Sequence, residues 1–226
     1  MRLALQNHIG NITAHYLSNP ALAYEAIDVV NEAVADSGPN IFKDAVPWYP
    51  ALPDYVNAAF LAARAADPKH ALLCYNDYGG EGLSSQKGAK ILQLVKDMLA
   101  AGIPITCVGL QMHIHVDSAP SAADVSANIA ALGALGMTVH ITEMDVACPN
   151  CSPARLQAQA QLYADILSAC LKNSNCKSFE FWGIYDGDTW LGENQAPLLW
   201  DAQWRAKPAF DAVLATLQAH ARARSG

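Results

Sequence analysis

Two carboxylic acids in this 226-residue chain directly follow short β-branched runs, at Glu32 and at Glu143. The runs, residues 27–30 and 139–142, are typical of buried strands in a parallel sheet, and a core strand gains nothing from a polar ending. An isolated run of this kind would more often lead into an exposed loop, but the second instance favours a site. Where strands and helices alternate around a barrel, the C-terminal strand ends meet at one mouth. Two carboxyl groups converging there are what cleavage of a glycosidic bond requires.

Hydrophobic periodicity predicts the elements that must position these acids. Helices are expected near residues 3–18, 53–66, 84–102, 121–136, 152–171 and from Pro208 onward. The run before Glu143 is expected to form a strand over 138–142, and further strands are expected at 71–75, 106–112 and 178–181. Ser121 and Ser152 are suitable N-caps, and Gly102 and Gly136 are suitable residues for ending a helix. Every predicted strand ends in a polar or aromatic residue.

Strands that alternate with helices in this way predict an α/β fold of the (β/α)8 TIM barrel type. A doubly wound open sheet is the rival, but no glycine-rich phosphate loop follows the first strand. Five strand-helix units and a leading helix are expected. Because eight such units need roughly 300 residues, about three units have no counterpart in this chain.

Composition bounds the class of protein. The chain is 52% hydrophobic and 15% charged, with a formal charge of -7, which suits one soluble domain with a large core. Its basic residues are scattered, so neither nucleic acid nor a membrane is an expected partner. No run approaches the roughly 18 apolar residues of a membrane span, and the start turns polar too early for a signal peptide. We expect one domain over residues 1–219 and a frayed tail over 220–226.

Six cysteines raise the question of disulfides or metal. Cys170 and Cys176 flank a short polar turn and could close a small disulfide loop. The CxxC pair Cys148 and Cys151 is compatible with metal, redox chemistry or a disulfide. A shared zinc site is excluded, because the predicted helix between the two pairs is about 30 Å long. Local disulfides or free thiols remain, whereas Cys74 and Cys107, inside apolar strands, are expected to be small buried hydrophobic residues.

Six ordered motifs together resemble glycoside hydrolase family 10, whose members are chiefly endo-β-1,4-xylanases. The motifs are Asp28–Glu32, Asn76–Tyr78, Gln111–His113, Ile141–Asp145, Phe181–Gly183, and Pro197–Asp201 followed by Lys207 and Pro208. The resemblance runs from the first helix to about Leu217 and corresponds to the last five strands of the family barrel. It also implies secretion and a disulfide between Cys170 and Cys176. Ile27, Gly79 and Met112 depart from the usual family residues but leave the acids in place.

The resemblance assigns roles to the strand-end residues. It implies that Glu32 is the acid/base and Glu143 the nucleophile of a retaining mechanism that acts on xylan or xylo-oligosaccharides. Sugar-binding roles are expected for Asn31, Tyr78, Gln111, His113, Trp182 and Trp190, with Asp145 orienting His113 from behind. Trp48, Trp200 and Trp204 are expected to pack in the interior. No metal or cofactor is expected.

A second hypothesis is that the chain as given is a weak or silent fragment of such an enzyme that retains some sugar binding. Without three units, the first and last strands would expose unpaired backbone groups. Exposed strand edges promote association with other chains, so self-association is expected unless another segment closes the barrel.

Overall fold

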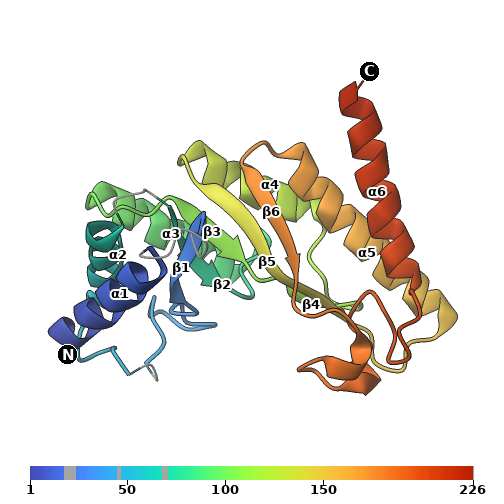
Figure 1. The fold of residues 1–226 in the computed structure, drawn as a ribbon, viewed down its shortest axis with the longest axis horizontal. Helices are drawn as coiled ribbons and strands as arrows, with labels where there is room; N and C mark the ends of the chain where they lie inside the picture. The colour runs from blue at the N-terminus through green and yellow to red at the C-terminus, as the bar shows by residue number, and fades with distance from the viewer. Residues whose placement is uncertain (18–23, 45–46, 68–70, 226) are drawn as a thin grey trace.

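The computed structural model describes residues 1–17, 24–44, 47–67 and 71–225. An open, curved sheet is flanked by helices, with the N-terminal helix at one end of the arc and the C-terminal helix at the other (Figure 1). The helices are α1 Arg2–Leu17, α2 Tyr55–Ala66, α3 Gln86–Ala100, α4 Ala122–Ala134, α5 Pro153–Lys172 and α6 Pro208–Ser225. The strands are β1 Ala26–Asn31, β2 Leu72–Asp77, β3 Cys107–Leu110, β4 His113–His115, β5 Thr138–Ala147 and β6 Cys176–Phe181, and two short 3-10 turns are η2 Asp186–Asp188 and η3 Glu193–Gln195.

The strands are parallel and follow chain order across the sheet. Strand β3 pairs with the first part of β5 and β4 with its last part, so β3 and β4 occupy one strand position in two pieces. Among the described strands, β1 pairs only with β2 and β6 only with β5, which leaves both as sheet edges. This arrangement is a partial (β/α)8 barrel with five strand positions, as the sequence predicted.

One predicted strand differs from the structure at its C-terminal end. The sequence predicts a continuous strand over 106–112, but the backbone of Met112 has a φ of 65° and the strand is interrupted between β3 and β4. A positive φ cannot continue a pleated strand. The break redirects the chain so that β4 can pair further along β5.

The predicted helix starts at Ser121 and Ser152 are confirmed. Each side chain accepts a hydrogen bond from the backbone N–H three residues ahead, at Asp124 and Arg155. Ser85, rather than Ser84, caps α3. The last helix, α6, continues to Ser225 and so includes most of the predicted tail.

The core fills the space between sheet and helices, and its largest fully buried side chains include Phe60, Leu73, Tyr75, Ile141 and Tyr163. Trp48 and Trp200 pack against this core as expected. Trp204 does not, since 59% of it is exposed. The interior prediction for Trp204 is therefore wrong.

All six cysteines are paired in disulfides. The Cys170–Cys176 bond agrees with the expectation, and Cys148–Cys151 resolves the CxxC motif as a disulfide. Cys74 and Cys107 are buried, as expected, but they are also bonded to each other, which the sequence analysis did not predict. They are direct partners in the register between β2 and β3, and such pairing across strands is invisible in a pattern of single-strand hydrophobicity.

Candidate active site

Glu32 lies immediately beyond β1. Within that strand, an extra residue between Asp28 and Val30 forms a bulge against β2. The Glu32 backbone has a φ of 58°, and its N–H donates to the carbonyl of Asn76 at 2.9 Å. Bulges and left-handed residues next to sites serve to aim a side chain. One carboxylate oxygen of Glu32 accepts a hydrogen bond from the Gln111 amide at 3.0 Å.

Glu143 lies within β5, not after it, because this strand is longer than the sequence suggests and runs to Ala147. The pairing with β6 shifts between Ile141 and Met144, so this bulge contains the acid itself. One carboxylate oxygen accepts from the Asn76 amide at 2.7 Å, and the other lies 3.2 Å from Nε2 of His113. Both oxygens of Glu143 therefore have fixed partners.

Three side-chain amides connect the two acids. The Gln111 amide nitrogen donates to Glu32 and to Asn31 Oδ1, each at 3.0 Å. The Asn76 amide nitrogen donates to the same Asn31 oxygen at 3.0 Å and to Glu143. Each NH2 group has two hydrogens, and both are used, which determines the orientation of each amide. Asn31 and Glu143 are therefore linked through Asn76.

Two neighbours hold the Asn76 side chain in place. Thr142 donates its hydroxyl to Asn76 Oδ1 at 2.8 Å. Gly109 on β3 gives the amide its space, because a Cβ at that position would lie 2.2 Å from Asn76 Oδ1. The close approach to Glu143 thus depends on a residue without a side chain.

His113 lies between two carboxylates. Its Nδ1 is 3.0 Å from Asp145 Oδ2, and its Nε2 faces Glu143. Burial alone would lower the pKa of His113, but the hydrogen bond to Asp145 and the charges of both acids outweigh burial and raise that pKa above its ordinary value. Trp190 donates its indole N–H to the same Asp145 oxygen at 2.8 Å. Asp145 thus orients the imidazole and the indole together.

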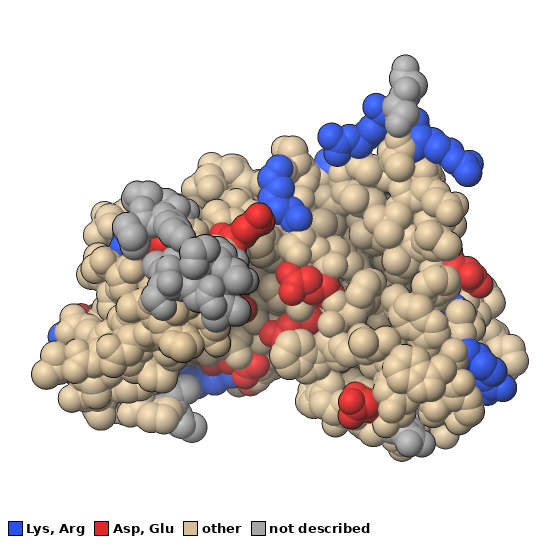
Figure 2. All heavy atoms as spheres, in the orientation of Figure 1, with Lys and Arg blue, Asp and Glu red and all other residues tan. Residues whose placement is uncertain are grey.

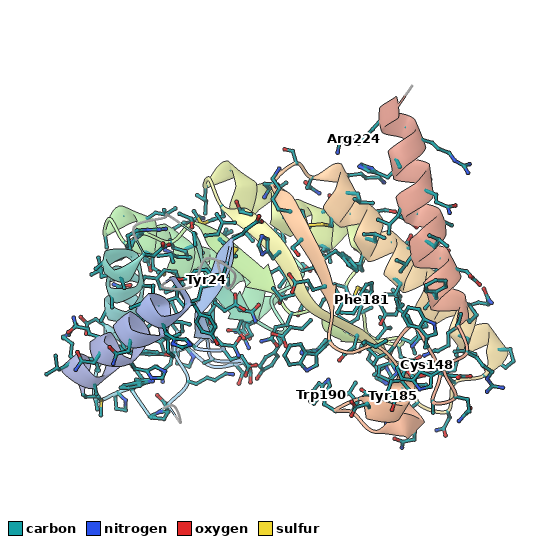
Figure 3. All side chains as sticks on the ribbon, viewed as in Figure 1. Tyr24, Cys148, Phe181, Tyr185, Trp190 and Arg224 are labelled. Carbon is teal, nitrogen blue, oxygen red and sulfur yellow. A yellow bond between two sulfur atoms is a disulfide. The ribbon has the colours of Figure 1, made fainter. Side chains whose placement is uncertain are left out.

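Trp182 and Trp190 present aromatic surface beside this histidine. They are 50% and 62% exposed. Their rings meet His113 edge-on, with centroids 6.2 Å and 5.1 Å from the imidazole. Figure 3 shows Trp190 on the loop that follows β6.

Among the described residues, Lys43 connects Tyr78 to Glu32. Its hydroxyl donates to Asp36 at 2.9 Å and accepts from Lys43 at 3.2 Å. The Lys43 ammonium is also 3.9 Å from the second carboxylate oxygen of Glu32. The buried Lys87 lies 3.5 Å above the Tyr78 ring. Tyr78 is therefore a fixed part of the wall next to Glu32.

A third acid, Asp28, lies close to Glu143. Asp28 as a whole is exposed, but loss of solvent around its carboxyl group, followed by the charges of Glu143 and Glu180, raises its pKa to about 6. A hollow of about 200 Å³ is lined by Ala26, Asp28, His140, Thr142, Glu143, Glu180 and Trp182. Asp and Glu side chains are visible near the centre of this face of the molecule (Figure 2).

The structure thus brings together Asn31, Glu32, Gln111, His113, Glu143, Asp145, Trp182 and Trp190, with Tyr78 at the periphery. Sequence reasoning missed Asn76, Lys43 and Asp28 as parts of the site. Asn76 lies at a strand end within a recognised motif, so its position could have indicated it. Nothing in the local sequence distinguishes Lys43, because it lies on a long loop whose path only the fold determines.

Paired carboxylates at the C-terminal ends of parallel barrel strands, with stacking aromatics beside them, define the class of glycoside-bond hydrolases. The sequence profile described as "Glycosyl hydrolase family 10" matches residues 1–216. The chain belongs to this family.

Similar proteins agree with this membership. Endo-1,4-beta-xylanase B of Neocallimastix patriciarum is 35% identical over 229 residues, covering 100% of this chain and 25% of that protein. The crystal structure of xylanase 10B from Thermotoga petrophila in complex with xylobiose has a TM-score of 0.84 and 32% identity, covering 94% of this chain and 64% of the other. The intracellular xylanase of Thermoanaerobacterium saccharolyticum, in complex with xylotriose, has a TM-score of 0.85 and 32% identity, covering 94% and 65%. The chain thus spans a quarter to two thirds of the length of these three proteins.

Gly109→Ala should displace the Asn76 amide from Glu143, because the added methyl group would overlap Asn76 Oδ1. In an NMR spectrum we expect the two Asn76 amide protons to move towards the shifts of a solvent-exposed asparagine. Gly102→Ala is not a suitable control, since its φ of 68° would add strain, so Gly10→Ala on α1, with open space around it, serves instead. Unchanged Asn76 resonances in Gly109→Ala would contradict the packing argument.

The raised pKa of His113 predicts a pH-dependent stability. Protonated His113 is stabilised by Asp145 and Glu143, and this contribution is complete below the ordinary pKa of about 6.5 and is lost as pH rises through the raised value. His113→Gln should therefore lose most stability, relative to the wild type, near pH 5 to 6 and less at alkaline pH. Urea unfolding across a pH series measures the difference. A difference in the free energy of unfolding between the wild type and His113→Gln that grows with rising pH would contradict this prediction.

Proposed function

We propose that this chain is the acid-bearing part of a retaining endo-1,4-β-xylanase, with Glu143 as nucleophile and Glu32 as acid/base. The observation that carries the proposal is the amide network that joins the two carboxylates across the strand ends. Retaining hydrolysis needs one carboxyl group that donates a proton and a second that attacks carbon. The different surroundings of the two acids suit this division.

In the first step, a carboxylate oxygen of Glu143 attacks the anomeric carbon and forms an ester. The bond from that carbon to the glycosidic oxygen breaks, and Glu32 gives its proton to this oxygen. Glu143 must be ionised to attack. The hydrogen bond from Asn76 and the contact with His113 Nε2 hold the Glu143 carboxylate in one orientation for this attack.

In the second step, Glu32, now ionised, takes a proton from water as the water oxygen attacks the same carbon. The ester bond breaks and Glu143 leaves as a carboxylate, so the two inversions retain configuration. The Gln111 hydrogen bond keeps the Glu32 carboxyl group in one place during both proton transfers. These residues complete the cycle by themselves.

We propose β-1,4-linked xylan or xylo-oligosaccharides as substrate. The xylobiose and xylotriose complexes of the two similar xylanases support this choice. The faces of Trp182 and Trp190 suit the C–H surfaces of sugar rings. Asn31, Gln111 and His113 then supply polar contacts to sugar hydroxyl groups, and Tyr78 contributes beside Glu32.

We propose an oxidising compartment, and hence secretion, for the mature protein. The three disulfides support this, because such bonds persist outside the reducing cytosol. No helix in the described part of the chain is long and apolar enough to cross a membrane. One similar xylanase is described as intracellular, so family membership alone does not determine location.

The alternative function is a silent fragment with residual sugar binding. The two open sheet edges, β1 and β6, favour it, because strands with unpaired backbone groups associate with other chains. The amide network, by contrast, lies wholly on β1, β2, β5 and the segment between β3 and β4. The site can therefore be formed while the surrounding cleft stays incomplete.

The two acids should respond differently to substitution when the chain is fused behind the first three strand-helix units of a related xylanase. Glu143→Gln should abolish xylan hydrolysis, because a neutral amide cannot form the ester. Glu32→Ala should be severe on xylan yet mild on aryl xylosides, whose leaving groups need little protonation. Rates on both substrates test this, with Glu25→Gln as an exposed acid control. Glu143→Gln activity within tenfold of the parent would contradict the assignment.

The unfused 226-residue chain should turn over xylan far more slowly than the fusion, since catalysis draws on remote sugar contacts to distort the reacting sugar. It should also elute from size-exclusion chromatography as an oligomer. A reducing-sugar assay on the same fractions gives the turnover. A monodisperse monomer turning over at about 10 per second, a typical enzyme rate, would rule out the silent-fragment alternative.

A further inference from the structure

Trp204 is an apolar side chain with a large exposed surface outside the candidate active site. It is 59% exposed and lies in the turn between Trp200 and Ala206, which pair as an antiparallel bridge. A single exposed hydrophobic residue needs no explanation by itself. Two features of its backbone and ring distinguish this one.

The backbone of Trp204 is left-handed, with a φ of 62°. Glycine and asparagine adopt this conformation readily, whereas for a bulky side chain it is an outlier. The turn enforces it through Asp201, whose carbonyl accepts from the Trp204 N–H and whose carboxylate accepts from the N–H groups of Gln203 and Arg205, all at 2.9 Å. The chain thus holds an indole where a smaller residue would be less strained.

The indole is stacked on Tyr185. The ring centroids are 3.9 Å apart and the planes differ by 18°. One face of the indole is therefore covered, and the exposure of Trp204 belongs to the rest of the ring, including the opposite face. A flat aromatic surface that is fixed before binding loses little conformational freedom when a ligand stacks on it.

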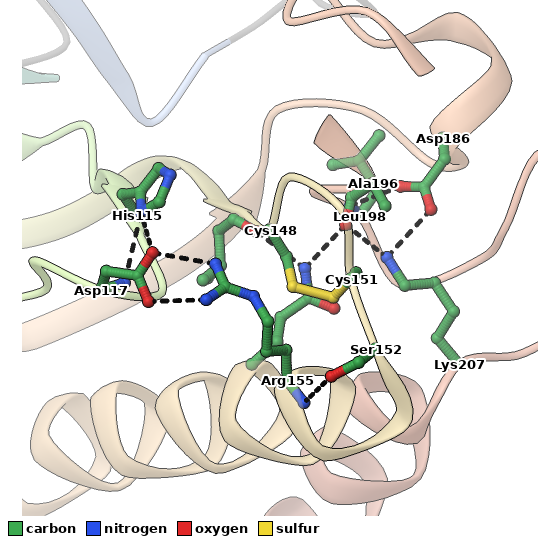
Figure 4. The surroundings of a disulfide bond; sticks show 12 residues. His115, Asp117, Cys148, Cys151, Ser152, Arg155, Asp186, Ala196, Leu198 and Lys207 are labelled. Carbon is green, nitrogen blue, oxygen red and sulfur yellow. Dashed lines mark hydrogen bonds and ion pairs between the residues drawn. A yellow bond between two sulfur atoms is a disulfide. The ribbon is translucent and has the colours of Figure 1, made fainter. Parts of the chain in front are cut away.

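A buried ion pair anchors the turn from below. Lys207, just beyond the turn, is 2.9 Å from Asp186, the residue after Tyr185. Asp186 also accepts from the backbone N–H of Leu198 (Figure 4). Its own N–H donates to the Trp200 carbonyl. The two segments that carry Tyr185 and Trp204 are therefore joined at their bases.

We propose that Trp204, backed by Tyr185, is a stacking platform for a neutral polysaccharide chain, separate from the candidate catalytic carboxylates. The inference rests on the proposed function for the identity of the polymer. Sugar rings present C–H faces that stack on an indole, and the neighbouring cation, Arg205, is already paired with Asp201 at 2.7 Å. Trp190 and Trp204 both lie in the segment between β6 and α6, so one connection carries the platform and part of the aromatic surface of the site.

The test is electrophoresis through gels that contain soluble arabinoxylan, with every protein in a Glu143→Gln background so that the polymer stays intact. Trp204→Gly removes the ring and relieves the left-handed backbone, so the turn should keep its conformation. We expect its dissociation constant for arabinoxylan to rise about three- to tenfold, the range that aromatic contacts supply. The dissociation constant of Trp204→Tyr, which keeps a flat ring, should rise less. Tyr16 is an exposed aromatic residue on α1, and Tyr16→Ala should leave the dissociation constant unchanged.

Two further measurements separate the platform from its rivals. The thermal unfolding midpoint of Trp204→Gly should equal or exceed that of the parent. Xylobiose is too short to reach a second platform, so it should shift the NMR signal of the Trp190 indole equally in both proteins. If arabinoxylan in the gel retards Trp204→Gly as much as the parent, the proposal is overturned. A change of oligomeric state without loss of retention would also overturn it, because that result would make the ring a contact between copies. The Glu143→Gln parent should lose hydrolysis but still be retarded by arabinoxylan in the gel. Binding at Trp204 is then measured independently of the catalytic assignment.

Discussion

The site depends on the Asn76 amide, which is buried at the end of β2 and uses both of its hydrogens on Asn31 and Glu143. Buried amides are costly when a hydrogen bond is unmade, so a fully satisfied one strongly favours a single arrangement. The same Asn31 oxygen accepts from Gln111, which holds Glu32. The positions of both acids are therefore coupled through one asparagine oxygen.

This coupling explains how an incomplete barrel can contain a well-formed site. The network draws its members from neighbouring strand positions in the middle of the arc and from one edge strand, β1. The bulge in β5 contains Glu143, and a left-handed backbone at Glu32 turns the chain out of β1. What the open edges lack is the surrounding cleft and its sugar contacts, which matter for turnover more than for the placement of the carboxylates.

The electrostatics divide the site into two halves. Glu143 faces an imidazole whose pKa is raised by Asp145 and by Glu143 against the effect of burial. Loss of solvent around its carboxyl group and the charges of Glu143 and Glu180 raise the pKa of the nearby Asp28 to about 6. Glu32, by contrast, has a neutral amide on one oxygen and a distant lysine on the other.

The sequence by itself determined the local features: strands ended by Glu32 and near Glu143, serine caps at Ser121 and Ser152, and an alternation typical of a barrel with five units. These features depend on residues close together in the chain, so their periodicity and capping chemistry can be recognised from the order of the residues. The tertiary structure decided what depends on register and on long loops. It bonded Cys74 to Cys107 across two strands, made Asn76 the direct partner of Glu143, interrupted a strand at Met112 and brought Lys43 to Glu32. It also exposed Trp204, because a turn fixed by Asp201 points this ring outward against Tyr185, and no hydrophobicity pattern records the direction of a turn.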